Sequence, residues 1–183
     1  MDASQLDPIA IIQRYYSVNS KAYNILLRHS ESVAQMALDI IDAHPQWEIN
    51  RTLAYQAAML HDIGIFKCHA PAIGCTGEHP YICHGFLGSQ LLLQLQLPLH
   101  ARVCERHTGT GISCQTIIKN NWPLPHRDMM PTTLLEQVIC FADKFYSKSG
   151  NQQRKSVHAI QQSLLHYSTD DYERFNTWCQ LFL

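Results

Sequence analysis

The sequence has no surplus of positive charge. Its 183 residues contain 14 Lys and Arg against 15 Asp and Glu, which gives a formal net charge of −1. Proteins that bind nucleic acids or anionic membranes through a general electrostatic field usually carry an excess of basic residues. The balance therefore argues against both kinds of partner, and we expect neither a nucleic acid nor a membrane to bind this chain.

Long hydrophobic runs are also absent. The most apolar stretch, Leu91–Leu99, is interrupted by two glutamines and Pro98. A membrane-spanning helix needs about 20 consecutive apolar residues, far more than this stretch offers. Residues 1–7 lack the basic region and the apolar core of a secretory signal peptide. We therefore expect a cytoplasmic protein without a spanning helix.

The paired C-x2-C spacing of common zinc modules does not occur among the seven cysteines. An odd number of cysteines in a chain of this length does not favour a disulfide framework either, and a reducing compartment suits it. One alternative stays open, because Cys75, His79 and Cys83 are spaced at intervals of four residues and could hold a structural zinc ion in a loop.

What the sequence does have is enough apolar material for one core, with 46% hydrophobic and 16% charged residues. Apolar residues recur at helical spacing, and no strand-like alternation of any length occurs. We predict an all-α bundle of about eight helices that forms one domain over 1–183, with a long loop over 64–84 and C-terminal helices over 151–183 packed on the rest. The helix starts are marked by Asp7-Pro8, Ser20, Asn50, Ser113 and Thr132, and the helix that Thr132 begins should close at Ser149-Gly150.

Several polar residues occupy helical positions that should be apolar. His29 shares a helix face with Leu26 and Val33, and Asp143 ends an almost wholly apolar run. Burying an unpaired carboxylate costs several kcal/mol, so Asp143 needs a metal, a salt bridge or several hydrogen-bond donors. The simpler interpretation of His29 is a hydrogen-bonded core histidine.

His61 and Asp62 stand where a predicted helix ends, just before Gly64. Adjacent helical residues point about 100° apart, but a turn at the helix end lets two such side chains converge. Together with His29 and Asp143 they supply two imidazoles and two carboxylates from three helices. Nitrogen and oxygen ligands of this kind suit Mn, Fe, Zn or Mg rather than metals bound by thiolates.

The order His29, His61-Asp62, Asp143, with the tetrapeptide HDIG at 61–64, resembles the HD superfamily of metal-dependent phosphohydrolases. Those proteins are all-α, and the resemblance covers about residues 20–150, which would make this chain a single HD domain. The segments that begin at His84 and His107 are similar to those of a small prokaryotic branch of the superfamily.

The resemblance implies a second metal ion. HD proteins with two metals have two extra histidines between the HD pair and the last aspartate, and His84 and His107 occupy that interval in that order. His79 competes with His84 for the first of these places. The simpler interpretations are that His84 begins a helix and that His107 caps the C-terminus of one.

The resemblance further implies the activity and the cofactors. We expect a hydrolase that cleaves a phosphoester or phosphoanhydride bond of a nucleotide or a related phosphate ester with two divalent ions (Fe, Mn, Zn, Ni or Mg). Asp62 would bridge the ions and act as the catalytic residue. Three basic residues near the ligands in sequence are candidates for binding the substrate phosphate, and each would otherwise be a solvated surface charge: Lys67, Arg106 and Lys144.

The sequence departs from the family pattern at two points, and the second of them disfavours cyclic-di-GMP as the substrate. Ile65 follows HDIG where some members have a lysine, and the GYP tripeptide of cyclic-di-GMP phosphodiesterases is absent. Two alternatives remain, a catalytically silent HD module that binds a nucleotide or a protein partner, and an interaction protein held together by zinc in the 68–84 loop. The sequence does not indicate an oligomeric state.

Overall fold

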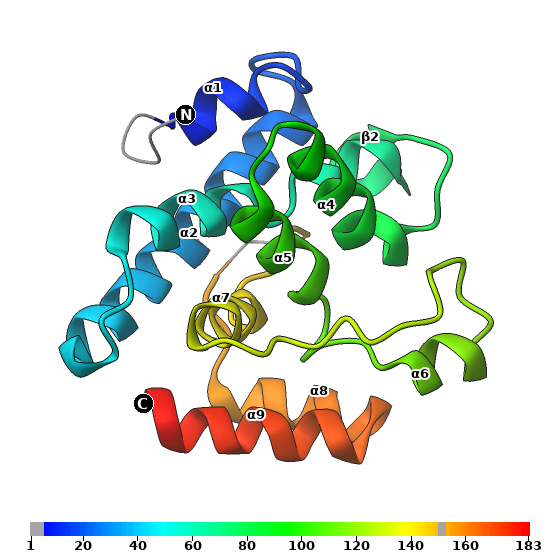
Figure 1. The fold of residues 1–183 in the computed structure, drawn as a ribbon. Helices are drawn as coiled ribbons and strands as arrows, with labels where there is room; N and C mark the ends of the chain where they lie inside the picture. The colour runs from blue at the N-terminus through cyan, green and yellow to red at the C-terminus, as the bar shows by residue number, and fades with distance from the viewer. Residues whose placement is uncertain (1–5, 150–152) are drawn as a thin grey trace.

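The computed structural model describes residues 6–149 and 153–183, which form nine α-helices and one small sheet (Figure 1). The prediction of an all-α bundle is confirmed, with one helix more in these ranges than the approximate count expected. The helices are α1 (Pro8–Ile12), α2 (Lys21–Ala43), α3 (Arg51–Leu60), α4 (His84–Gln94), α5 (Pro98–Arg106), α6 (Cys114–Lys119), α7 (Leu134–Lys144), α8 (Val157–Tyr167) and α9 (Thr169–Phe182).

Four of the five predicted capping residues are N-caps of helices: Asp7, Ser20, Asn50 and Ser113. The Asn50 side chain accepts a hydrogen bond from the backbone N–H of Leu53 at 2.9 Å, and Asp7 and Ser20 cap α1 and α2 in the same way. The N-cap of α7 is Thr133 rather than Thr132, because Thr133 forms a reciprocal capping box with Glu136.

The end of α7 differs from the prediction. The helix stops at Lys144, with Phe145 as its C-cap, and does not run on to Ser149. Gly150, the other residue of the predicted stop, lies outside the described residues. The prediction of one domain over 1–183 stays a prediction.

The predicted long loop contains a small hairpin. Strands β1 (His69–Ala70) and β2 (Cys75–Thr76) pair antiparallel, and short 3-10 turns flank them. Each strand has two residues, which is too short to produce an alternating pattern in the sequence.

Of three apolar clusters, the two larger ones hold most of the helices together, and α2 and α3 contribute to both; the third packs α6 against α4. The cluster nearer the C-terminal helices joins α2, α3, α7 and α9 and includes the rings of Phe141 and Phe175, whose centroids lie 5.3 Å apart. The other joins α1, α2, α4 and α5 around Leu26 and Leu92. Figure 1 shows α8 and α9 lying along one side of the bundle next to α7.

Close packing between glycines brings the HD pair next to α4. A Cβ atom at Gly64 would lie 2.2 Å from the carbonyl oxygen of His84 and 2.5 Å from the backbone nitrogen of Gly88, so no other residue fits there. A Cβ atom at Gly85 would lie 2.7 Å from the carbonyl oxygen of Cys104, so α4 and α5 also pack closely at this glycine. These contacts bring together the end of α3, the start of α4 and the end of α5.

Within the described ranges, none of the helices has both the length and the hydrophobicity required to cross a membrane.

Candidate metal centre

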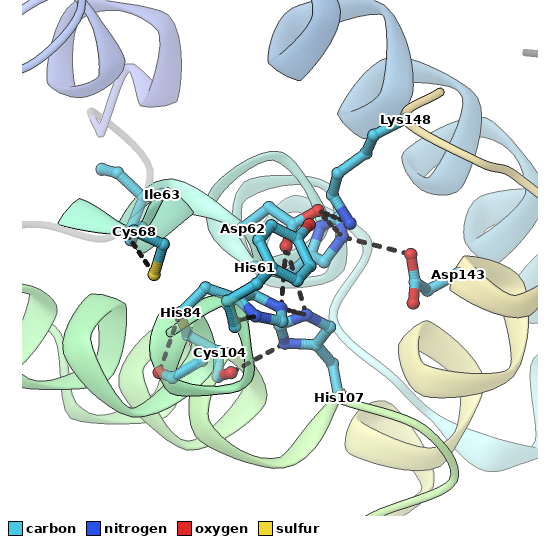
Figure 2. Close-up of polar contacts among 12 residues, drawn as sticks. His61, Asp62, Ile63, Cys68, His84, Cys104, His107, Asp143 and Lys148 are labelled. Carbon is cyan, nitrogen blue, oxygen red and sulfur yellow. Dashed lines mark hydrogen bonds and ion pairs between the residues drawn. The ribbon is translucent and has the colours of Figure 1, made fainter. Parts of the chain in front are cut away.

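All six residues predicted as metal ligands lie in one buried cluster (Figure 2). In the part of the chain that the structure describes, ligand-type side chains form two groups that share Asp62, and the ligand atoms of each group lie within 4.8 Å of one another. The first group is His29, His61, Asp62 and Asp143, and the second is Asp62, His84 and His107.

The first group joins α2, the end of α3 and α7. Nε2 of His29 lies 3.1 Å from Oδ2 of Asp62 and 3.0 Å from Oδ1 of Asp143. Nε2 of His61 lies 3.1 Å and 3.6 Å from the same two oxygens. The four atoms therefore converge on one point, as the ligands of a single ion do.

The second group uses the other oxygen of Asp62. Nε2 of His84 and Nε2 of His107 each lie 3.3 Å from Oδ1 of Asp62 and 3.0 Å from each other. The two carboxylate oxygens of Asp62 thus face two different sets of imidazoles. This geometry suits a carboxylate that bridges two metal ions.

Backbone carbonyls fix three of the four imidazole rings. In each ring, Nδ1–H donates to the carbonyl oxygen of the residue three positions earlier, at 2.5 to 2.7 Å. The pairs are His61 with Ala58, His84 with Tyr81, and His107 with Cys104. These partners assign the Nδ1 tautomer to the neutral rings and leave the Nε2 lone pair directed at Asp62.

This arrangement fits a bound cation. His84 and His107 point two lone pairs at each other across 3.0 Å and at a carboxylate oxygen, so three hydrogen-bond acceptors meet without a proton between them. A divalent ion relieves that repulsion, and carbonyls that orient imidazole ligands are a common outer shell of metal sites. The residues present therefore fit a metal centre.

In the metal-free chain, protons and a lysine balance the buried carboxylates. Burial, the largest influence on His61, lowers its pKa, but the charges of Asp62 and Asp143 outweigh it and raise the pKa to about 9. Burial raises the pKa of Asp62, yet the positive charges of Lys148 and His61 hold it well below its usual value. Burial lowers the pKa of His84 to about 3, so this ring stays neutral.

Lys148 is a residue of the site that the sequence analysis missed. Its Nζ lies 2.6 Å from Oδ2 of Asp62, and its side chain is only 14% exposed (Figure 2). It follows α7 in an irregular segment, where no periodicity or motif distinguishes a buried lysine from a surface one. Tertiary packing alone brings it to the centre.

The three predicted phosphate-binding residues have different surroundings. Nζ of Lys144 lies 3.7 Å from Oδ2 of Asp143, and this side chain lines the cavity next to the centre. Arg106 instead pairs with Glu136 at 3.0 Å, because both residues lie where α5 packs against the start of α7. The ammonium of Lys67 stands over the Phe66 ring, 6.0 Å from its centroid. Neither Arg106 nor Lys67 lines that cavity, and phosphate binding by either residue stays a prediction.

His79 lies in the hairpin region and belongs to neither ligand group. Its side chain is exposed, and its backbone bonds to Lys67 and His69 in the hairpin, whereas His84 is buried in the second group. Cys75 and Cys83 are buried, and burial raises the pKa of both thiols. The two groups around Asp62 are the only candidate ligand clusters among the described residues, so no loop zinc site is found there.

A family model and two known proteins match parts of this chain. A family model described as "HD domain" matches residues 26–147. A tRNA (cytidine(56)-2'-O)-methyltransferase from Picrophilus torridus is 30% identical over 130 residues, which cover 70% of this chain and 33% of that protein. An uncharacterized protein from Methanocaldococcus jannaschii is 29% identical over 121 residues, 64% of each chain. This chain therefore covers about a third of the length of the first relative and slightly less than two thirds of the length of the second. No solved structure matches it.

Proposed function

This chain belongs to the HD domain family, and from that premise we propose that it is a metal-dependent phosphohydrolase. The proposed reaction is hydrolysis of a phosphoester or phosphoanhydride bond in a nucleotide or a related phosphate ester. The proposed cofactors are two divalent ions, one in each ligand group.

The observation that carries this proposal is the position of Asp62. Its Oδ2 faces His29 and His61 at 3.1 Å, and its Oδ1 faces the second pair of histidines at 3.3 Å. The side chain is fully buried, so neither carboxylate oxygen is exposed to solvent. One carboxylate held between two imidazole sets supports a dinuclear centre more directly than any other feature of the chain.

When bound, two divalent ions supply positive charge to the phosphate oxygens and lower the pKa of a water molecule. The chain's own residues supply the geometry. Asp62 and Asp143 would hold the centre, Asp143 also lines the cavity next to it, and Lys148 presents an ammonium group beside Asp62 that can bind a phosphate oxygen. The nitrogen-rich ligand set favours Fe, Mn, Zn or Ni over Mg, which prefers oxygen ligands.

Methyl transfer to tRNA is not part of the proposal. The chain spans only a third of the relative that carries that name. The cluster around Asp62 consists of side chains that could hold metal ions, and it is this cluster that supports the proposed hydrolysis.

The test combines metal analysis with a hydrolysis assay. Chain purified without chelators should contain about two transition-metal ions, one for each ligand group, and should hydrolyse bis(p-nitrophenyl) phosphate or a member of a nucleotide panel. Asp62→Ala should lose both the metal and the activity. Cys75→Ala, a buried residue outside both groups, should keep them.

Two outcomes would count against the proposal. If the Asp62→Ala variant kept both its metal and its activity, the metal centre would take no part in the reaction. A wild-type chain that holds both ions and binds nucleotides without turnover would instead be a catalytically silent HD module.

A further inference from the structure

A cavity of about 860 Å³ opens next to the metal centre, with Asp143 in its lining. One wall is formed by Lys144 at the end of α7 and by Tyr146–Ser149 after it, and another by α8 with Lys155 just before it. Tyr81 and Trp122 line it from other parts of the chain. The cavity is much larger than a single phosphate group. The residues that line the rest of it therefore indicate which other chemical groups a ligand carries.

Three lysines line this one cavity: Lys144, Lys148 and Lys155. The side chains of Lys144 and Lys148 are 16% and 14% exposed, so both are largely enclosed. Lys155 is an exposed residue of the same lining, and partial burial with the charges of Lys144 and Lys148 lowers the pKa of its ammonium group. Like charges gathered in the lining of one cavity favour binding of an anion there.

The acidic residues of the lining do not offset these charges in the loaded protein. Asp171 already accepts a hydrogen bond from Thr110 at 2.5 Å and pairs with Arg174 at 3.4 Å. Two divalent ions would bring twice the charge that Asp62 and Asp143 carry. The cavity wall then bears a net positive charge, more than a singly charged phosphodiester could balance.

Part of the cavity lining is aromatic. Trp122 and Tyr167 line both this cavity and a second one of about 290 Å³, so the two cavities adjoin. Tyr167 is 79% exposed, and such exposure of an aromatic ring at a cavity edge is typical of a surface that stacks on a flat ligand. Polar groups of Ser113 and Asn120 line the smaller space.

We propose that this cavity binds a nucleoside polyphosphate, with one phosphate at the metal centre, a further phosphate on Lys144 and Lys155, and the base on the Trp122–Tyr167 side. This inference rests on the proposed function, because it names the substrate class of the same site. It adds two subsites, one for a second phosphate and one for a planar ring, that the metal ligands alone do not imply.

Binding to the manganese-loaded full chain tests the proposal by calorimetry. The probes are adenosine 5′-monophosphate, the β,γ-methylene analogue of ATP and inorganic tripolyphosphate. The analogue should bind at least about tenfold more tightly than the monophosphate, the gain expected from added charge-assisted contacts. Tripolyphosphate should bind more weakly than the analogue, because it has no ring to stack.

Lysine variants locate the second phosphate. Lys155→Met should abolish most of the preference for the analogue over the monophosphate, while the monophosphate affinity and the metal content stay within about twofold of wild type. Lys119→Met is the matched control, since Lys119 ends α6 on the surface and lines neither cavity. It should leave all three affinities unchanged and so exclude a general charge effect.

The results separate this inference from the proposed function. Equal affinity for the monophosphate and the analogue, or an equal loss of both in Lys155→Met, would overturn the second phosphate subsite. Tripolyphosphate binding as tight as the analogue would overturn the ring subsite. A chain that shows the Lys155-dependent preference but hydrolyses none of the panel would keep the inference and refute the phosphohydrolase.

Discussion

The ammonium nitrogen of Lys148 lies 2.6 Å from Oδ2 of Asp62, the oxygen that also faces His29 and His61. A cation of the chain thus occupies the neighbourhood that a metal ion needs. The ion and the ammonium compete for the same buried carboxylate, and this competition has measurable consequences.

Replacement of Lys148 should separate metal binding from catalysis. Lys148→Met removes the competing charge, so the first ligand group should bind Mn²⁺ about tenfold more tightly, the equivalent of about 1.4 kcal/mol. The same variant should hydrolyse substrate more slowly, because it lacks the proposed phosphate contact. Metal titration and steady-state kinetics on one preparation check both, and tighter metal binding with unchanged kcat would show that Lys148 does not touch the substrate.

The metal-free form of Lys148→Met should also be less stable. Removing one partner of a buried ion pair leaves Asp62 without its closest positive charge, which costs about 3 kcal/mol. Urea unfolding with and without Mn²⁺ measures the loss. The deficit should shrink when the metal is present, since binding to the folded state adds stability, and a deficit of equal size in both forms would contradict the competition.

Substitution of single ligands should remove ions one group at a time. His107→Ala takes a ligand from the second group only, so metal content should fall from about two ions per chain to about one. His29→Ala should leave the second group loaded in the same way. Elemental analysis of the purified variants decides the matter, and loss of both ions in each variant would mean that the two groups form one inseparable site.

Metal uptake should strengthen as the pH rises. The Asp62 and Asp143 charges overcome the effect of burial and raise the pKa of His61 to about 9, so near neutral pH this ring carries a proton that a metal must displace. Below about pH 9 the apparent affinity should increase by up to about tenfold per pH unit and then level off. Calorimetry in two buffers of different ionisation enthalpy counts the released protons, and an affinity that does not change between about pH 6 and pH 8 would contradict this assignment.

The Gly64 position should tolerate no side chain. In Gly64→Ala the new methyl group would meet backbone atoms of His84 and Gly88, which cannot move as a flexible side chain can. We expect a loss of about 3 kcal/mol in the free energy of unfolding. Gly109→Ala is the comparison, because it has space but a φ of +67°, and it should cost about 1 kcal/mol. Equal losses in urea unfolding would mean that small backbone shifts relieve the close contact, so that it does not make position 64 more sensitive than Gly109.

The sequence allowed the first ligand group to be predicted because its members break a pattern. His29 and Asp143 interrupt apolar helix faces, and the HD pair stands at a helix end before a glycine, so each departs from what helical periodicity predicts. His84 and His107 were reached only through the family resemblance, since each is also an ordinary residue for the end of a helix.

Features that depend on distant contacts were not predictable. Arg106 pairs with Glu136, a partner on another helix, and does not line the cavity beside the metal centre. Lys148 is buried by the surrounding tertiary structure, and nothing in its own neighbourhood in the sequence marks it. The two-residue strands are stabilised by a turn and by packing rather than by a pattern of their own.

Three ligand rings take their orientation from a carbonyl only three residues earlier in the chain. Each ring and its carbonyl form a local unit that needs no information from the rest of the sequence. The segments between these units are therefore free to change in length and composition while the rings keep their direction. The walls of the cavity can diversify, and with them the choice of substrate, around a centre that stays the same.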